Sequence, residues 1–201
     1  MRDIVINEIL EPALYRLYKE DYDNIRWGAS ERNICARLAH HMENIMREYD
    51  YLHNSSLFNS FYADVEYNRM GNGDLKHYEN SEHRPRYFVS DLLIHARGRD
   101  RNFLAVEMKR KGNHRNVTSD KERLSRIVSF PSDILENECV YNTLIGAFIT
   151  YSPQKVNIVL FENHRGKGRS TQEITFIFKD RVLVKIGSVL TSDIKDNNYL
   201  D

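Results

Sequence analysis

The stretch RYFVSDLLIHARGRDRNFLAVEMKRKG, Arg86 to Gly112, decides the fold that we predict for this chain. Two apolar runs flank the polar residues 98–100, a pattern typical of a β-hairpin with a short loop that contains glycine. Asp91, Glu107 and Lys109 interrupt these runs, although core strands favour residues such as Val and Ile. The three charges therefore need a physical reason to stand there.

A turn at residues 98–100 fixes which residues of the two strands face each other. In that register Asp91 lies opposite Glu107, and Lys109 shares their face because residues two apart on a strand point the same way. A turn one residue longer or shorter would move Asp91 to the other face, so the prediction depends on this register. The other face is apolar and is the expected core face, with Phe88, Leu92, Ile94, Leu104, Val106 and Met108.

Two carboxylates on neighbouring strands repel each other, and each raises the pKa of the other. A divalent cation reverses this effect, because Mg²⁺ prefers oxygen ligands and is typically held by one or two carboxylates with water and phosphate. Lys109 would then hold developing negative charge or help to deprotonate an attacking water. This combination indicates a site that hydrolyses phosphodiesters. The alternative is a solvent-facing sheet surface on which Lys109 forms salt bridges with both acids.

A third carboxylate, Glu31, stands at the start of a predicted helix. Ser30 is a suitable N-cap, and the helix is expected to run to about Tyr49. At helical spacing, Glu31 points in the same direction as the apolar stripe that includes Ile34 and Leu38. An inward-pointing glutamate is costly unless it is paired or coordinates something. Helix capping, or interaction with the helix dipole, is the alternative.

The remaining pattern predicts one α/β domain over residues 1–201. Residues 1–50 are helical in pattern, with Pro12 expected to kink or divide the first helix. Residues 61–190 have the pattern of a mixed sheet, interrupted by a helix from Ser119 to about Glu136. Helices on either side of a mixed sheet are the expected architecture. The neighbours His40 and His41 lack a partner at metal-ligand spacing and are expected on the surface.

Composition limits the setting of the protein. No run approaches the roughly 20 apolar residues of a membrane span, and the first residues lack the pattern of a signal peptide. Two cysteines form neither a disulfide framework nor a zinc motif, which favours a reducing cytoplasm.

Charge is balanced overall, with 29 basic and 29 acidic residues, but it is unevenly distributed. Between Arg97 and Arg126 there are ten Lys or Arg against four Asp or Glu, and a second basic cluster, HRGKGR, starts at His164. Local basic fields of this kind attract polyanions even on a neutral protein. A solvated charged surface is the alternative.

The order of Glu31, Asp91 and Glu107-Met108-Lys109 resembles that of the PD-(D/E)XK nuclease superfamily. The phrases VEYNR, SDLLIHARG and NFLAVEMKR are similar to those of small bacterial members, and the resemblance covers roughly residues 30–161. Ser90 departs from the pattern, since the family usually has Pro before the Asp.

The resemblance implies a restriction-endonuclease-like fold and assigns roles to residues. Asp91 and Glu107, completed by Glu31, would hold Mg²⁺ or Mn²⁺, and Lys109 would assist the attacking water. The family's helix after this motif often supplies a group for phosphate, and Lys121 is the candidate here. Further expected nucleic-acid contacts are Arg110, Lys111, Arg69, which closes the preceding strand, and His95, which shares the face of Asp91 but is otherwise an exposed residue near the turn.

We therefore expect a nuclease that cleaves phosphodiester bonds, with DNA as the substrate. A homodimer would suit cutting of both strands. Two alternatives remain open from the sequence. One is a nuclease-fold binding or regulatory module that has lost catalysis, and the other is an RNA-directed nuclease of a defence or toxin-like system.

Overall fold

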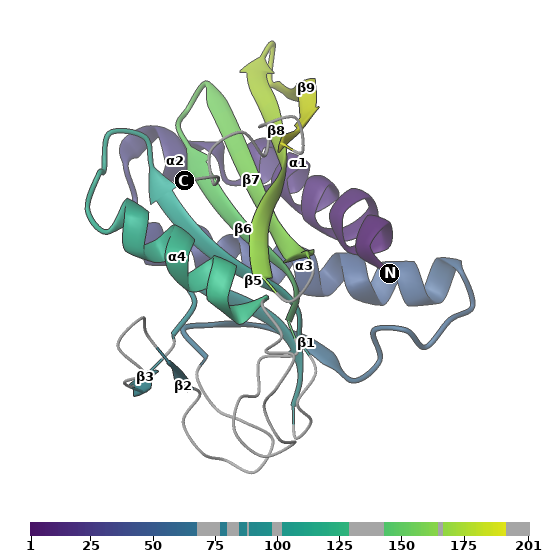
Figure 1. Ribbon diagram of the computed structural model, residues 1–201. Coiled ribbons are helices and arrows are strands. Elements are labelled where there is room, and N and C mark those ends of the chain that lie inside the picture. The colour runs from purple at the N-terminus through teal and green to yellow at the C-terminus, as the bar shows by residue number, and fades with distance from the viewer. Residues whose placement is uncertain are drawn as a thin grey trace.

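The computed structural model describes residues 1–67, 77–79, 85–87, 89–97, 102–128, 143–164 and 167–191, with the backbone alone in 77–79 and 85–87. These residues form a seven-stranded mixed sheet with helices on both faces (Figure 1). Helices α1 and α3 cover one face and α4 crosses the other, as the predicted α/β architecture requires (Figure 1). None of the described helices is both long enough and apolar enough to span a membrane.

The first part of the chain is helical, as predicted. Pro12 stands in the first turn of α1, where its missing N–H costs nothing, so it divides the predicted helix into a π-helical turn and α1. Ser30 caps α3, with its Oγ accepting a hydrogen bond from Asn33 N at 3.2 Å. The four elements are η1 (Ile4–Leu10), α1 (Glu11–Glu20), α2 (Tyr22–Trp27) and α3 (Glu31–Leu52).

The strand order of the large sheet is β1-β4-β5-β6-β7-β8-β9, with β5 and β6 parallel and the other neighbours antiparallel. Between the two parallel strands the chain forms α4 (Val117–Ile127). The end predicted for this helix, near Glu136, lies outside the described residues. The strands are β1 (Phe61–Val65), β4 (Leu92–Ala96), β5 (Asn102–Arg110), β6 (Thr143–Tyr151), β7 (Lys155–His164), β8 (Lys167–Lys179) and β9 (Val182–Leu190).

The hairpin has the predicted register. Leu92 pairs with Val106 and Leu93 with Ala105, and continuing that register by one residue brings Asp91 opposite Glu107. The predicted turn at residues 98–100 lies outside the described residues, and a β-bulge follows Ile94.

The first strand of the hairpin is shorter than the sequence pattern indicates, because β4 begins only at Leu92. Residues 85–87 instead form β3 (Pro85–Tyr87), which pairs with β2 (His77–Glu79) in a separate two-stranded sheet. Asp91 gives a physical reason for the late start: its Oδ2 accepts the backbone N–H of Met108 at 2.7 Å, so a side chain takes the place of a ladder bond.

The sheet separates two apolar layers. The larger layer lies against α1 and α3 and includes Leu92, Leu104, Val106 and Met108, which confirms the expected core face for these residues. The smaller layer lies against α4 and includes Leu93, Ala105, Leu124 and Phe148. Because side chains alternate along a strand, Glu107 and Lys109 belong to the α4 side of the sheet.

Helix α4 lies unusually close to the sheet. A Cβ at Gly168 of β8 would lie 1.7 Å from the backbone oxygen of Ser125, so this approach requires glycine. Ser125 Oγ also donates a hydrogen bond to the Gly168 carbonyl at 2.5 Å. The close approach fixes the position of α4 over the charged residues of β5.

The expectation that His41 is a surface residue is wrong. Its side chain is buried, and its Nε2 lies 2.6 Å from Asp21 Oδ2. Arg37 Nε also donates to Asp21, at 2.7 Å, and together these groups hold the pKa of the Asp21 carboxyl below its usual value against the opposite effect of burial. The partner lies 20 residues away in the sequence, so no local spacing reveals it.

Candidate functional site

Four elements bring charged side chains together around Glu107 and Lys109 of β5. Asp91 precedes β4, Glu107 and Lys109 lie near the end of β5, Glu31 begins α3, and α4 adds an acid and an arginine. We call this group the carboxylate cluster; it consists of Glu31, Asp91, Glu107, Lys109, Asp120 and Arg123.

Asp91 lies where β4 begins, half-buried against the backbone of β5. Burial raises the pKa of Asp91, and the nearby charges of Asp120 and Glu31 add to that effect. The Met108 N–H and the Lys109 ammonium act in the opposite direction, but the pKa of Asp91 remains above its ordinary value. The hydrogen bond from Met108 uses only Oδ2, so the geometry leaves Oδ1 as a second potential ligand atom.

Among the acids that were predicted from the sequence, Glu107 is the most deeply buried, with only 1% of its surface exposed. Burial, followed by the negative charge of Asp91, raises the pKa of Glu107 to about 8. Arg123 opposes this shift, because its Nη2 and Nε lie 3.0 and 3.3 Å from Glu107 Oε1. The effect of the Asp91 charge on the pKa of Glu107 is the one expected from their predicted proximity.

Lys109 lies between two acids that come from different helices. Its Nζ is 3.1 Å from Asp120 Oδ2 and 3.8 Å from Glu31 Oε2. Burial alone would lower the pKa of Lys109, but the charges of Asp120, Asp91 and Glu31 raise it above the ordinary value. Lys109 therefore remains an ammonium at neutral pH in this arrangement, which suits stabilisation of negative charge.

Glu31 reaches the cluster from the first turn of α3. Its Oε1 accepts hydrogen bonds from Arg110 N at 2.9 Å and from Asn113 Nδ2 at 2.7 Å, while Oε2 faces Lys109. The side chain is half-buried and ties the end of β5 to α3. The inward direction predicted from the helical stripe therefore brings Glu31 to the predicted residues.

Sequence reasoning missed Asp120 and Arg123. Asp120 is 1% exposed and lies on the same face of α4 as Leu124 and Ile127, at spacings of four and seven residues. That spacing was a usable signal, since an acid in an apolar stripe needs partners. Arg123 Nη2 contacts Asp120 Oδ1 at 2.5 Å as well as Glu107, so it joins the two acids.

Lys121, the expected phosphate contact, points toward Phe148 and not toward Lys109. Its Nζ lies over the ring of Phe148, 5.1 Å from the ring centre, a cation–π arrangement. Lys121 follows Asp120 by one residue, so a helix places the two side chains about 100° apart. The helix therefore directs Asp120, and not Lys121, toward Lys109.

The other expected nucleic-acid contacts differ in their surroundings. The Arg110 guanidinium lies against the backbone of Gly28, where a Cβ would come within 2.2 Å of Arg110 Nη1. Gly28 has a φ of 79°, a conformation that favours glycine. Lys111 is exposed, and its backbone N donates to Tyr151 O at 2.7 Å. Arg69 lies outside the described residues.

The expectation of an exposed or substrate-facing His95 is wrong. Only 2% of its surface is exposed, and its Nε2 lies 2.9 Å from Asp64 Oδ2 on β1. The ring also packs on Tyr67, with ring centres 4.0 Å apart. Because β1 pairs with β4, a neighbouring strand covers a side chain that looks exposed in the hairpin alone.

The donor atoms of the cluster fit a hard divalent cation. All the acidic ligand atoms are carboxylate oxygens, and with four acids against two cations the fully ionised cluster has a formal charge of −2. Within the described ranges, however, no three His, Cys, Asp or Glu side chains form a ready-made metal site. Glu107 turns one oxygen toward Arg123. Asp91 and Glu107 together are two carboxylates, a number that commonly suffices to hold Mg²⁺.

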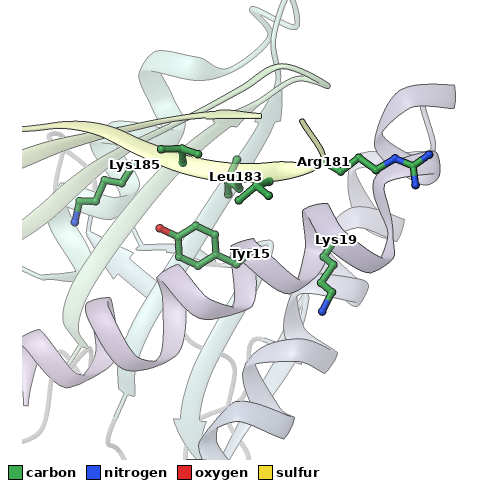
Figure 2. A pocket seen from close by; sticks show the side chains of 7 residues that line it. Tyr15, Lys19, Arg181, Leu183 and Lys185 are labelled. Carbon is green, nitrogen blue, oxygen red and sulfur yellow. The ribbon is translucent and has the colours of Figure 1, made fainter. Parts of the chain in front are cut away.

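A pocket of about 710 Å³ lies elsewhere, between α1 and β9 (Figure 2). Tyr15 of α1 lies below Leu183 and Lys185 of β9, Lys19 extends away from that strand, and Arg181 precedes it (Figure 2). Lys185 is paired with Glu11 at 2.6 Å. The pocket lining contains no carboxylate, so it does not extend the cluster.

Comparisons with known proteins add no family to this geometry: no family model, no curated protein and no solved structure matches the chain.

Proposed function

We propose that this protein is a metal-dependent nuclease of the restriction-endonuclease-like type that hydrolyses phosphodiester bonds in DNA. The observation that supports it most is the hairpin register. Pairing of Leu92 with Val106 and of Leu93 with Ala105 is the register in which Asp91 and Glu107 become neighbours. A purely structural role gives no reason to place Asp91 where its charge raises the pKa of the buried Glu107, whereas a shared cation does.

Asp91 and Glu107 are the residues that would hold Mg²⁺ or Mn²⁺ in this proposal. A cation bound there would activate water and neutralise charge on the phosphate. The contribution of Glu31 is positional, because it fixes the backbone of Arg110 at 2.9 Å and so fixes the end of the strand that carries Glu107 and Lys109.

Lys109 provides positive charge beside the two acids. The raised pKa keeps its Nζ protonated, so the ammonium is ready to stabilise negative charge that develops on phosphate oxygens. In this role the residue acts by charge and not by removing a proton from water.

Substitution of single residues tests the proposed activity. Asp91→Ala and Lys109→Ala should each lower cleavage of DNA by at least about a hundredfold, the size of the loss when one preorganised charge-stabilising group is removed. Cleavage should be followed with linear, nicked, branched and single-stranded DNA, with RNA in parallel, in MgCl₂ and after chelation with EDTA. Glu122→Gln, an exposed acid on α4, is the matched control and should cleave like the wild type. Wild-type rates in either cluster variant would refute the mechanism, and cleavage of RNA alone would reassign the substrate.

One observation favours the second candidate, a binding module without catalysis. Arg123 and Lys109 already neutralise Glu107 and Asp120 by direct contacts, so part of the cluster is satisfied without a cation. Such a module would bind nucleic acid in the same assays and cleave none of the substrates.

A further inference from the structure

The charges of α4 and β5 face each other in inverse order. On β5, acidic Glu107 precedes basic Lys109 by two residues, and on α4, acidic Asp120 precedes basic Arg123 by three. Arg123 contacts Glu107 at 3.0 Å, and Asp120 contacts Lys109 at 3.1 Å. The contact between Arg123 and Asp120 closes the network.

The geometry explains why these four residues match. Two residues of a strand span about 6.6 Å, whereas three residues of a helix rise only about 4.5 Å. The long side chains of Lys109 and Arg123 cover the difference, so each basic group reaches the acid on the other element. One turn of α4 is therefore charge-complementary to the Glu107–Lys109 pair.

Helix α4 does not depend on these contacts for its place on the sheet. Leu124 and Ile127 are fully buried, and Gly146 and Gly168 allow the helix to pack closely on β6 and β8. The hydrogen bond from Ser125 to Gly168 holds the helix two residues beyond Arg123. The charged contacts of Asp120 and Arg123 are therefore free to position β5 side chains and are not needed to hold the helix.

Asp120 needs a countercharge because it is a buried carboxylate. Its side chain is buried, and Oδ2 faces Lys109 in an ion pair that is not aligned as a hydrogen bond. A buried carboxylate that lacks its countercharge is strongly unfavourable, so Lys109 and Asp120 hold each other in place. Glu31, at 3.8 Å, is the more distant acid and is a weaker constraint on Lys109.

We propose that Asp120 and Arg123 form a positioning clamp, in which Asp120 orients the Lys109 ammonium and Arg123 orients the Glu107 carboxylate toward Asp91. This inference rests on the proposed nuclease function and adds two positioning residues to it. Neither residue needs to touch the substrate, since each acts through a residue of β5.

The test distinguishes a misplaced Lys109 side chain from a loss of folding and from weaker substrate binding. We would measure kcat and KM for DNA cleavage in Asp120→Ala and Asp120→Asn, at a temperature far below the Tm of each variant. A misplaced reactive group costs about a hundredfold in rate, so kcat of Asp120→Ala should fall by about that factor while KM stays within about twofold. Asp120→Asn keeps an oxygen that can accept from Lys109, and its kcat should lie between those of Asp120→Ala and the wild type.

Glu122→Gln is the control, because it removes one negative charge from an exposed site on the same helix. It should leave both kcat and KM unchanged. Wild-type kcat in Asp120→Ala would overturn the clamp while leaving the proposed function intact. A fall in kcat that appears only as a smaller folded fraction, and vanishes on cooling, would also overturn it.

A second measurement does not depend on catalysis. Thermal unfolding of Asp120→Ala, Lys109→Ala and the double variant forms a double-mutant cycle. The clamp predicts that the double variant loses less Tm than the sum of the single losses, because each single variant already removes the whole Lys109–Asp120 ion pair and leaves the remaining partner without that countercharge. Additive losses would overturn the clamp. An inactive wild type with a non-additive cycle would instead refute the proposed function and leave the contact established.

Discussion

At the residue scale, the cluster shows how burial and mutual repulsion act on the same carboxylates. Glu107 and Asp91 both have raised pKa values, with burial as the main cause for each. Arg123 and the Met108 N–H oppose the shift without removing it. Both carboxyl groups therefore release their protons less readily than free side chains do.

The raised pKa of Glu107 predicts how stability depends on pH in the absence of a cation. Between the ordinary value of 4.5 and about 8, the native state binds one more proton than the unfolded state. The unfolding free energy should therefore fall as pH rises through this window, by an amount on the order of a few kcal/mol.

Glu107→Gln removes this titration and should flatten the dependence. Urea unfolding of both proteins at a series of pH values, with EDTA present, measures the difference. Identical pH slopes for the wild type and the variant would show that the Glu107 pKa is not raised in solution.

At the same scale, the sequence was informative about some residues and silent about others. Asp91, Glu107 and Lys109 were found because period-two alternation within one hairpin places them on one face. His41 and His95 were misjudged because their partners, Asp21 and Asp64, come from other elements. Contacts of this kind depend on tertiary packing and leave no local pattern.

At the scale of elements, helix α4 decides the geometry of the cluster. The sequence predicted the helix, but Lys121, the expected phosphate contact, lies over the ring of Phe148, and Arg123 is the basic residue of α4 that contacts the cluster. The rotation of a helix over a sheet is set by close approaches such as that at Gly168, which a single helical pattern does not reveal. The prediction of elements was therefore better than the prediction of how they meet.

Gly168→Ala tests the importance of this approach. The new Cβ would lie 1.7 Å from a backbone oxygen of α4, so either the helix or β8 must move. We expect a loss of at least about 1–3 kcal/mol of unfolding free energy, the usual cost of overpacking, together with reduced cleavage as Asp120 shifts. Urea unfolding and the cleavage assay measure the two effects.

Gly187→Ala on β9 is the matched control, because no atom lies within 4 Å of its added Cβ. It should leave both stability and cleavage close to those of the wild type. Equal effects at the two glycines would contradict the role assigned to the α4 contact.

At the scale of the whole molecule, the large apolar core and helix α4 lie on opposite faces of the sheet. The N-terminal helices and one face of the sheet form the large apolar core, and Tyr18 OH of α1 donates to Ser152 O at 2.5 Å just beyond β6. The opposite face bears α4 (Figure 1), and Asp120 and Arg123 of this helix contact Lys109 and Glu107. The net charge of the chain is zero, so the proposed function requires local basic residues such as Lys111 to attract nucleic acid.

The most direct test of the central claim is thermal unfolding titrated with MgCl₂ and MnCl₂ in the wild type, Asp91→Ala and Glu122→Gln. A cation that binds only the native state raises its stability by mass action, so Tm should rise with concentration in the wild type and in Glu122→Gln. The rise should be absent in Asp91→Ala. No rise in the wild type, or an equal rise in Asp91→Ala, would contradict a cation site between Asp91 and Glu107.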